Sequence, residues 1–394
     1  MEEANRLKRL PPYLFTIIDN LKAEVIEKGV DVIDLSMGNP DIPPAKHIIE
    51  ELSEACRRAD YHRYSKASGD VEKRLNQAIA DWYKERFNVD LDPKKEVLPL
   101  IGSKEGVAHL STGFLNPDDI ALVPTPAYPV HFNGVIMAGG ILYSIPLSKE
   151  NKYLPNLSNL PSDVIRRSKL FFFSYPHNPT TAVADRGFYE KVVNWAKDKD
   201  LILAHDAAYS DIVLDGPKST SLMQIQGSKK QGIEFHTLSK SYNMAGWRIG
   251  FVVGNSDILA VLKKTKSYID FGIFRGIQSA AITALTGPQD CVKKTVSIYK
   301  ERVEFFVKGL NDMGWNVDMP KATFYIWAHI PLKYSGLTSL EFSSLLLREI
   351  GVAVAPGTGF GEYGEGFIRF AMVDEKKRLK EALSRIKSFL DIKV

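Results

Sequence analysis

The stretch LFFFSYPHNPTTAVADRGFYEKVVNWAKDKDLILA, residues 170–204, contains two short apolar runs with a helical segment between them. The runs, Leu170–Ser174 and Leu201–Ala204, are apolar throughout instead of alternating, which is typical of strands buried on both faces. The helical pattern covers Gly187–Asp198. A strand, a helix and a second strand in this order indicate a βαβ unit and hence a parallel sheet.

Similar apolar runs lie on both sides of this stretch, at Glu96–Ile101, Ile120–Val123 and Ile249–Val253. Helical segments alternate with these runs between about residues 47 and 285. We therefore expect an α/β fold in which residues 47–285 form a large domain on a mainly parallel sheet.

After about residue 286 the rhythm of the sequence changes. The pattern predicts a long charged helix over 288–313, strand-like segments at 322–330 and 367–372, and a closing helix over 374–390. These elements indicate a smaller α+β domain at residues 286–394. Residues 1–46 contain several prolines, and we interpret them as an N-terminal arm that joins the small domain.

Composition narrows the possible partners. The 394 residues include 51 Lys plus Arg and 47 Asp plus Glu, and the net charge of +4 is too weak and dispersed to indicate nucleic acid or a membrane surface. Two cysteines, Cys56 and Cys291, give neither a disulfide framework nor the spacing of a metal site. The sequence shows no secretory signal and no apolar run of bilayer length. We expect a cytoplasmic protein without a metal.

Ligands of open parallel sheets bind beyond the carboxyl ends of the strands, so residues that follow the apolar runs are candidates for a site. Lys240 lies between two serines, Ser239 and Ser241, and Arg248 follows eight positions later. A deprotonated lysine attacks a carbonyl, and an arginine grips a phosphate with a planar fork of donors. Together they indicate an aldehyde cofactor that carries a phosphate, although a lone lysine is usually a solvated surface charge.

Three polar residues follow the two runs of the opening stretch. Asp206 is either a helix N-cap or an anion that keeps a pyridine nitrogen protonated. Tyr209, three residues later, and Asn178, in an Asn-Pro-Thr turn, offer hydrogen-bond donors to an ionised oxygen of the same ring.

Three further signals are weaker when taken singly. The small-residue turn Gly102–Gly106 opens a helix and includes Lys104, which suits a phosphate, but such turns are common. Tyr128 either packs or stacks on a flat ring. Arg369 lies inside an alternating strand and needs an anion, which is either a substrate carboxylate or a structural salt-bridge partner.

The candidates occur in one succession, and that succession resembles the class I aminotransferases of the fold-type I pyridoxal 5′-phosphate (PLP) enzymes. The likeness runs from Ser36 to the last helix. Within the family, the sequence looks most like bacterial alanine (glutamate–pyruvate) aminotransferases, with LL-diaminopimelate aminotransferases as near relatives.

The resemblance implies a mainly parallel seven-stranded sheet, PLP as cofactor, and a homodimer with shared active sites. Lys240 would bond covalently to the cofactor and shuttle a proton. Asp206 would pair with the ring nitrogen, while Asn178 and Tyr209 hold the ring oxygen. The other implied cofactor contacts are Tyr128 on the ring and, at the phosphate, Ser103, Lys104, Thr237, Ser239, Arg248 and Tyr64 of the partner subunit. The implied substrate contacts are Arg369, Gly38, Asn178 and Tyr128, with the partner's residues around 13–18.

The chain departs from the family pattern at three places, and at one of them Thr237 stands where serine is common, so the hydroxyl is kept. Thr181 stands where a glycine usually follows Asn-Pro-Thr, so we expect this turn to avoid positive φ. The arginine that grips a distal carboxylate in aspartate-specific members is not evident, and residues 266–274 occupy that region.

The resemblance therefore implies a ping-pong aminotransferase that exchanges amino groups between alanine or glutamate and 2-oxoglutarate or pyruvate. Three alternatives stay open. They are an LL-diaminopimelate or aspartate aminotransferase, a C–S lyase or decarboxylase with the same cofactor, and a catalytically silent regulatory protein on the same fold.

Overall fold

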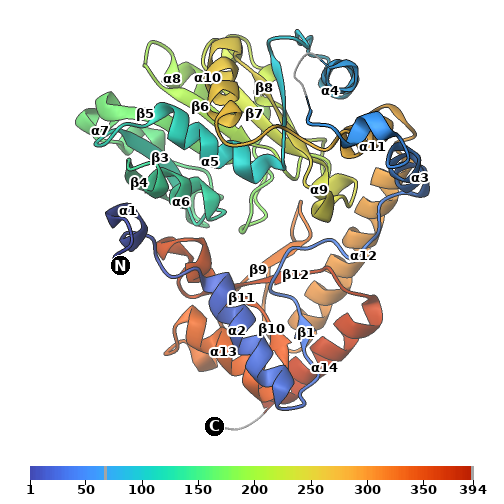
Figure 1. Cartoon of the computed structure of the whole chain (residues 1–394). Coiled ribbons are helices and arrows are strands. Elements are labelled where there is room, and N and C mark those ends of the chain that lie inside the picture. Colours follow the sequence, from blue (N-terminus) through green and yellow to red (C-terminus); the bar gives the residue numbers. More distant parts are fainter. Residues whose placement is uncertain (66–68, 392–394) are drawn as a thin grey trace.

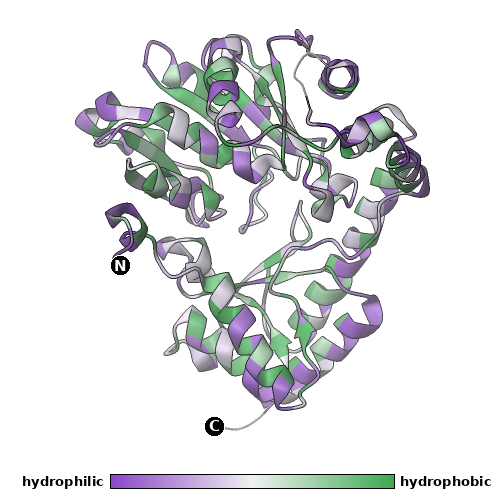
Figure 2. Ribbon diagram, viewed as in Figure 1, coloured by the Kyte–Doolittle hydropathy of each residue, from purple (hydrophilic) through white to green (hydrophobic). Residues whose placement is uncertain are grey.

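The computed structural model describes residues 1–65 and 69–391. Figure 1 shows two bodies, one built on a large sheet with helices on both sides and one formed by the C-terminal elements together with the N-terminal helix α2. The apolar residues concentrate in the strands and on the inner sides of the helices (Figure 2). Among the described helices, none is long and apolar enough to cross a membrane.

The large sheet has seven strands and is mainly parallel, as expected. Its order is β2 (Val97–Leu100), β8 (Gly250–Gly254), β7 (Gly232–Thr237), β6 (Ile202–Asp206), β5 (Ser168–Ser174), β3 (Ile120–Thr125) and β4 (Ile141–Pro146). Only β8 runs against its neighbours within this sheet, because it pairs antiparallel with both β2 and β7. All five predicted apolar runs are strands of this sheet.

Helices bury both faces of the sheet, which explains why its strands are apolar throughout. Phe171 and Phe173 of β5 face one cluster of helices, and Leu170 and Phe172 face the other. The first cluster includes α4 (Asp70–Phe87), α8 (Arg186–Ala196) and α11 (Arg275–Thr286). The second includes α5 (Ser103–Phe114), α6 (Val130–Met137) and α10 (Ser256–Ser267). The other helices of this part of the chain are α3 (Lys46–Ala55), α7 (Ser162–Arg167) and α9 (Leu238–Ser241).

The C-terminal body has a core of its own around two small sheets. One sheet has the order β11 (Ala355–Pro356), β12 (Phe367–Ala371) and β9 (Tyr325–His329), and the other pairs β1 (Ile33–Asp34) with β10 (Val352–Ala353). The helices are α12 (Asp290–Asp312), α13 (Ser339–Ile350) and α14 (Lys376–Asp391). Each predicted helix and strand of this region is present within a few residues of its expected bounds.

The N-terminal segment, which we expected to be an arm, contains two helices and a strand. It contains α1 (Asn5–Lys8) and α2 (Leu14–Glu27), and Leu21 and Val25 of α2 pack against Leu347 and Ala353. Its strand β1 pairs in parallel with β10. The segment therefore belongs to the C-terminal body, while the proposed domain limits at residues 46 and 286 stay a prediction.

A buried carboxylate holds the centre of the large sheet together. Glu234 on β7 is fully buried and accepts hydrogen bonds from four donors: the Tyr83 hydroxyl, ring nitrogens of His205 and His236 at 2.8 Å, and the Leu222 amide at 2.6 Å. Burial alone would raise the pKa of this carboxyl, but the hydrogen bonds from His205 and His236 outweigh burial and hold the pKa well below its ordinary value.

We predict that Glu234→Gln lowers the free energy of unfolding by roughly 3–5 kcal/mol near neutral pH. The NH₂ group of the glutamine is a donor, and it would face the donor groups that now bind the carboxylate. A carboxyl with a depressed pKa stabilises the folded state fully above its ordinary value of 4.5 and loses that contribution as the pH falls. The difference in the free energy of unfolding between wild type and Glu234→Gln should therefore be smaller at pH 4 than at pH 7. Glu190→Gln on an exposed helix face is the control, and equal stability of Glu234→Gln and wild type at pH 7 would contradict the prediction.

Candidate active site

A cavity of about 420 Å³ lies where the carboxyl ends of β5, β6 and β7 face the three-stranded sheet of the C-terminal body. Twelve of the predicted site residues line it: Gly38, Ser103, Lys104, Tyr128, Asn178, Asp206, Tyr209, Thr237, Ser239, Lys240, Arg248 and Arg369. Tyr64 does not, and its side chain is 74% exposed elsewhere on the surface. Tyr13 and Phe15 of the same chain also line the cavity, where we expected the partner's residues 13–18.

Lys240 follows β7 in the short helix α9, and its Nζ donates a hydrogen bond to the Gly38 carbonyl at 2.6 Å. Burial lowers the pKa of this amine from 10.5 to about 7, helped by the nearby cations Arg369 and Arg248 and opposed by Asp206. A substantial fraction of Lys240 is therefore the free amine at neutral pH, which is the form that attacks an aldehyde.

Asp206 ends β6 with its side chain buried in the cavity wall. His131 Nε2 lies 3.0 Å from Asp206 Oδ2, and the His131 ring stacks on Phe172 at 5.8 Å. The carboxylate is thus held in one orientation, as an anion for a pyridinium nitrogen must be. Sequence reasoning did not single out His131, which lies in the first turn of α6, three residues after Tyr128.

Arg369 is a buried cation without a carboxylate partner among the described residues. Its guanidinium donates to Asn178 Oδ1 at 2.7 Å and to the Ser36 carbonyl at 2.8 Å, and its Nε has no partner there. The rings of Tyr325 and Phe360 flank its Cζ at 4.0 and 4.6 Å. Of the two possibilities left open by the sequence, the structural salt bridge is absent from the described residues, so the guanidinium is available to an anionic ligand.

The other end of the cavity is a corner suited to a phosphate. Helix α5 begins at Ser103, directly after Gly102, and its first N–H groups have no carbonyl partners within the helix. A Cβ on Gly102 would lie 2.3 Å from Arg248 Nη2, so only a glycine lets the guanidinium approach this turn. Burial, together with Arg248, lowers the pKa of Lys104. Two cations and a helix N-terminus fit a dianionic group.

Thr237 and Ser239 complete the same corner. The Ser239 amide and the Thr237 hydroxyl form a hydrogen bond at 3.2 Å, and the two hydroxyl groups lie 2.9 Å apart. With Asp206 and Lys240 in the same cavity, the donor set matches a phosphorylated pyridine aldehyde: cations and hydroxyls for the phosphate, an anion for the ring nitrogen and an amine for the aldehyde.

The turn after Asn178 corrects one expectation. Thr181 has φ of +63°, although we expected this position to avoid positive φ. The Thr181 amide donates to the His177 carbonyl at 2.9 Å and the His177 amide donates to the Ala182 carbonyl at 2.9 Å. These two bonds close a turn that requires the left-handed conformation, so the fold imposes it on a β-branched residue.

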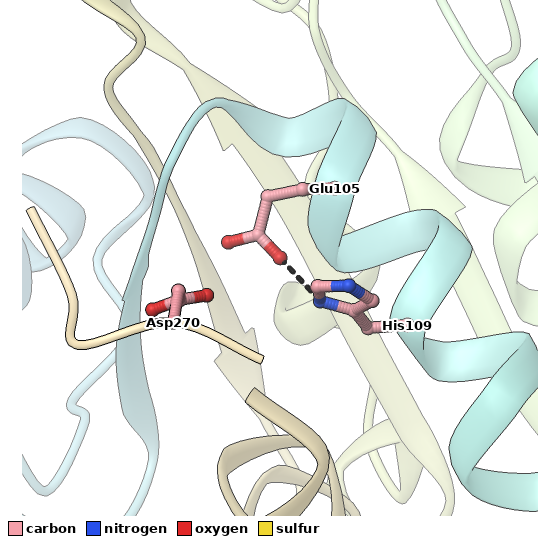
Figure 3. Close-up of side chains that lie close together, drawn as sticks. All are labelled: Glu105, His109 and Asp270. Atoms are coloured by element: carbon pink, nitrogen blue, oxygen red, sulfur yellow. Dashed lines mark ion pairs between the residues drawn. The ribbon is translucent and has the colours of Figure 1, made fainter. Parts of the chain in front are cut away.

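A cluster beside the phosphate corner has the composition of a metal site. Figure 3 shows Glu105, His109 and Asp270 close together, with His109 Nδ1 2.7 Å from Glu105 Oε2. Lys266 Nζ lies 2.5 Å from Glu105 Oε1 and 3.0 Å from Asp270 Oδ2. The Lys266 ammonium already supplies the positive charge that a metal ion would bring to these carboxylates. This is a physical reason for the prediction that the protein binds no metal, which stays a prediction.

Comparison with known proteins places these residues in context. The family model described as aminotransferase class I and II matches residues 30–386. An LL-diaminopimelate aminotransferase of Syntrophobacter fumaroxidans is 50% identical over 98% of both chains. The glutamate–pyruvate aminotransferase AlaC of Escherichia coli is 45% identical over 97% of this chain and 92% of that protein. The substrate-bound structure of BacF from Bacillus subtilis superposes with a TM-score of 0.94 at 38% identity, over 99% of this chain and 98% of that chain.

The lowered pKa of Lys240 makes a prediction about pH. Protein stripped of cofactor should react with pyridoxal phosphate at a rate that rises with pH around a midpoint of about 7, because the free amine predominates above that pKa. Borohydride trapping at a series of pH values measures this rate. Arg369→Leu should move the midpoint upward by removing a neighbouring cation. A wild-type midpoint near 10.5 would contradict the buried position of the amine.

Proposed function

Because the chain belongs to the class I and II aminotransferases, a family of PLP-dependent enzymes, we propose that it transfers an amino group from LL-diaminopimelate to 2-oxoglutarate. The sequence led us to put alanine or glutamate first. The similarity to several bacterial enzymes named LL-diaminopimelate aminotransferase supports the alternative instead.

Lys104 is the observation that carries this choice. Its ammonium lies in the cavity near the rings of Tyr13 and Tyr128, at 5.7 and 5.9 Å from their centroids, without a carboxylate partner among the described residues. Arg369 is a second cation that has no carboxylate partner among the described residues. LL-diaminopimelate carries a carboxylate at each end, so Arg369 would bind the one beside the reacting carbon and Lys104 the distal one.

The cofactor supplies an aldehyde that bonds to amines and a protonated ring that withdraws electrons from the reacting carbon. We assign the task of keeping the ring nitrogen protonated to Asp206, oriented by His131. Lys240 Nζ would take the proton from the substrate α-carbon and would serve as the acid that gives it back. Asn178 and Tyr209 would donate hydrogen bonds to the ring oxygen, and Arg369 would fix the substrate carboxylate.

The remaining residues hold the cofactor in place. Tyr128 would stack on the ring. The groups that would bind the phosphate are Arg248, the hydroxyls of Thr237 and Ser239, and the first N–H groups of α5 at Ser103 and Lys104. Gly38, whose carbonyl accepts from Lys240, would lie beside the substrate carboxylate.

A second candidate substrate pair is alanine with 2-oxoglutarate, which the similarity to AlaC supports. Alanine has no distal group, so Lys104 would have no part in its recognition. The same assays test aspartate as the amino donor. They also test a C–S lyase reaction, because a lyase releases ammonia and a 2-oxo acid without an amino acceptor.

We predict that LL-diaminopimelate donates its amino group to the cofactor-loaded enzyme with a higher kcat/KM than alanine, glutamate or aspartate in single-turnover experiments. Stopped-flow absorbance of the holoenzyme with each amino acid in parallel measures the rates. Lys240→Ala should abolish the reaction with all of them. A preference for alanine would reject the diaminopimelate assignment, and ammonia release without an acceptor would reject transamination.

The variant Lys104→Met distinguishes LL-diaminopimelate from alanine as the amino donor. Loss of a charge-assisted contact of about 1.5–3 kcal/mol should lower kcat/KM for LL-diaminopimelate roughly 10- to 100-fold. The value for alanine should change much less, because alanine has nothing for the ammonium to bind. An equal loss for both substrates would mean that Lys104 serves the cofactor alone.

We also propose that the enzyme is a homodimer with shared active sites. Tyr64, Tyr268 and Phe271 are 74%, 85% and 70% exposed, and the rings of Tyr64 and Phe271 lie 4.7 Å apart. A second cavity of about 660 Å³ is lined partly by Phe271 and Ser65. Clustered exposed aromatics of this kind mark an interface, and a partner seated there would bring Tyr64 to its phosphate corner.

Phe271→Glu should therefore shift the protein from dimer to monomer in sedimentation velocity, since it places a charge at the centre of the aromatic cluster. Leu332→Glu is the matched control, because Leu332 is 91% exposed but lies on a different surface. If the wild-type enzyme sediments as a monomer, or if both variants behave alike, the proposed interface is wrong.

A further inference from the structure

Tyr325 contacts both halves of the proposed site, although nothing in its sequence context singles it out. It lies on β9, is 2% exposed and lines the cavity. Its hydroxyl is 2.7 Å from the Tyr209 hydroxyl, and its ring faces the Arg369 guanidinium at 4.0 Å. It therefore joins a proposed donor to the cofactor with the proposed carboxylate anchor.

The surroundings of Tyr325 fix the position of its hydroxyl. A Cβ on Gly38 would lie 1.8 Å from Tyr325 Oη, so the backbone at Gly38 closes one side of this oxygen. Tyr209 is its hydrogen-bond partner within the described part of the chain. The strand register pairs Tyr325 with Ala371, two residues from Arg369, so Tyr325 and Arg369 lie on the same face of the three-stranded sheet.

The direction of the hydrogen bond follows from proton counting. Each phenol has one proton, so in the pair one hydroxyl donates and the other keeps its proton for a different acceptor. If Tyr209 donates to the ring oxygen of the cofactor, Tyr325 must donate to Tyr209. A donor that itself accepts a hydrogen bond is polarised and becomes a stronger donor.

We propose that Tyr325 is a positioning residue: its hydroxyl donates to Tyr209, directs the Tyr209 proton toward the ring oxygen of the cofactor, and links that bond to the anchor Arg369. Asn178, the second donor to the same oxygen, accepts a hydrogen bond from Arg369. Both donors to the ring oxygen thus contact side chains on one face of the three-stranded sheet. This inference rests on the cofactor placement proposed above and is independent of the substrate.

The experiment is a pH titration of the cofactor absorbance in the holoenzyme, which follows the proton held between Lys240 Nζ and the ring oxygen. Tyr325→Phe keeps the ring on Arg369 and removes one oxygen atom. A weaker donor at Tyr209 leaves more negative charge on the ring oxygen, which holds that proton more tightly. The midpoint should rise by about 0.5 pH unit, a threefold change in the equilibrium.

A double-mutant cycle tests the relay itself. Tyr209→Phe should raise the midpoint further than Tyr325→Phe, and the double variant should match Tyr209→Phe alone, because Tyr325 acts through Tyr209. In steady state, Tyr325→Phe should lower kcat several-fold while KM for the amino donor changes less than twofold, since the ring still faces Arg369.

Tyr299→Phe is the matched control. Tyr299 is fully buried in the C-terminal core and its hydroxyl has no hydrogen-bond partner among the described residues, so its removal should leave the titration unchanged. An unshifted midpoint in cofactor-loaded Tyr325→Phe, or additive shifts in the double variant, would overturn the role of Tyr325. A wild-type enzyme that forms no cofactor absorbance would overturn the cofactor placement together with it.

Discussion

An excess of positive charge governs this cavity. Arg369, Arg248, Lys104 and Lys240 line it, whereas Asp206 is the single acidic residue among the described residues that do so. Burial disfavours the charged form of an amine, and neighbouring cations repel it further, so Lys240, a stronger acid than the arginines, is the group whose pKa falls to about 7. The same positive charge makes the site receptive to anions, so it contributes both to the activation of the amine and to the capture of phosphate and carboxylate groups.

The fold brings this charge together through the order of its strands. β5, β6 and β7 are adjacent and parallel, so their carboxyl ends present Asn178, Asp206 and Lys240 side by side. The opposite wall comes from a separate sheet that carries Arg369. Glu234 fastens β7 to α4 and to its neighbouring strand behind the site, and this arrangement keeps a polar centre rigid inside an otherwise apolar body.

Most of the fold and most of the site were predictable because their signals are local. Buried parallel strands are recognised by continuous apolar runs, but the reversed direction of β8 leaves no mark in its own residues. The strands β4 and β7 gave weaker signals, one because it is an edge strand with half-buried residues and the other because it contains Glu234 and His236. His131 and Tyr325 act through contacts with residues distant in the chain, and Thr181 adopts its backbone angle because the surrounding turn demands it.

Phe15 in the first turn of α2 and Tyr13, the residue before the helix, form part of the cavity wall. The rest of α2 packs on the C-terminal body. These two rings belong to neither strand set that carries the proposed chemistry. Natural variation in this short N-terminal segment can therefore reshape the wall of the cavity beside Lys104 and Arg369. Divergence of amino acid preference among homologous transferases has a route here, through a part of the chain that lies outside the large sheet.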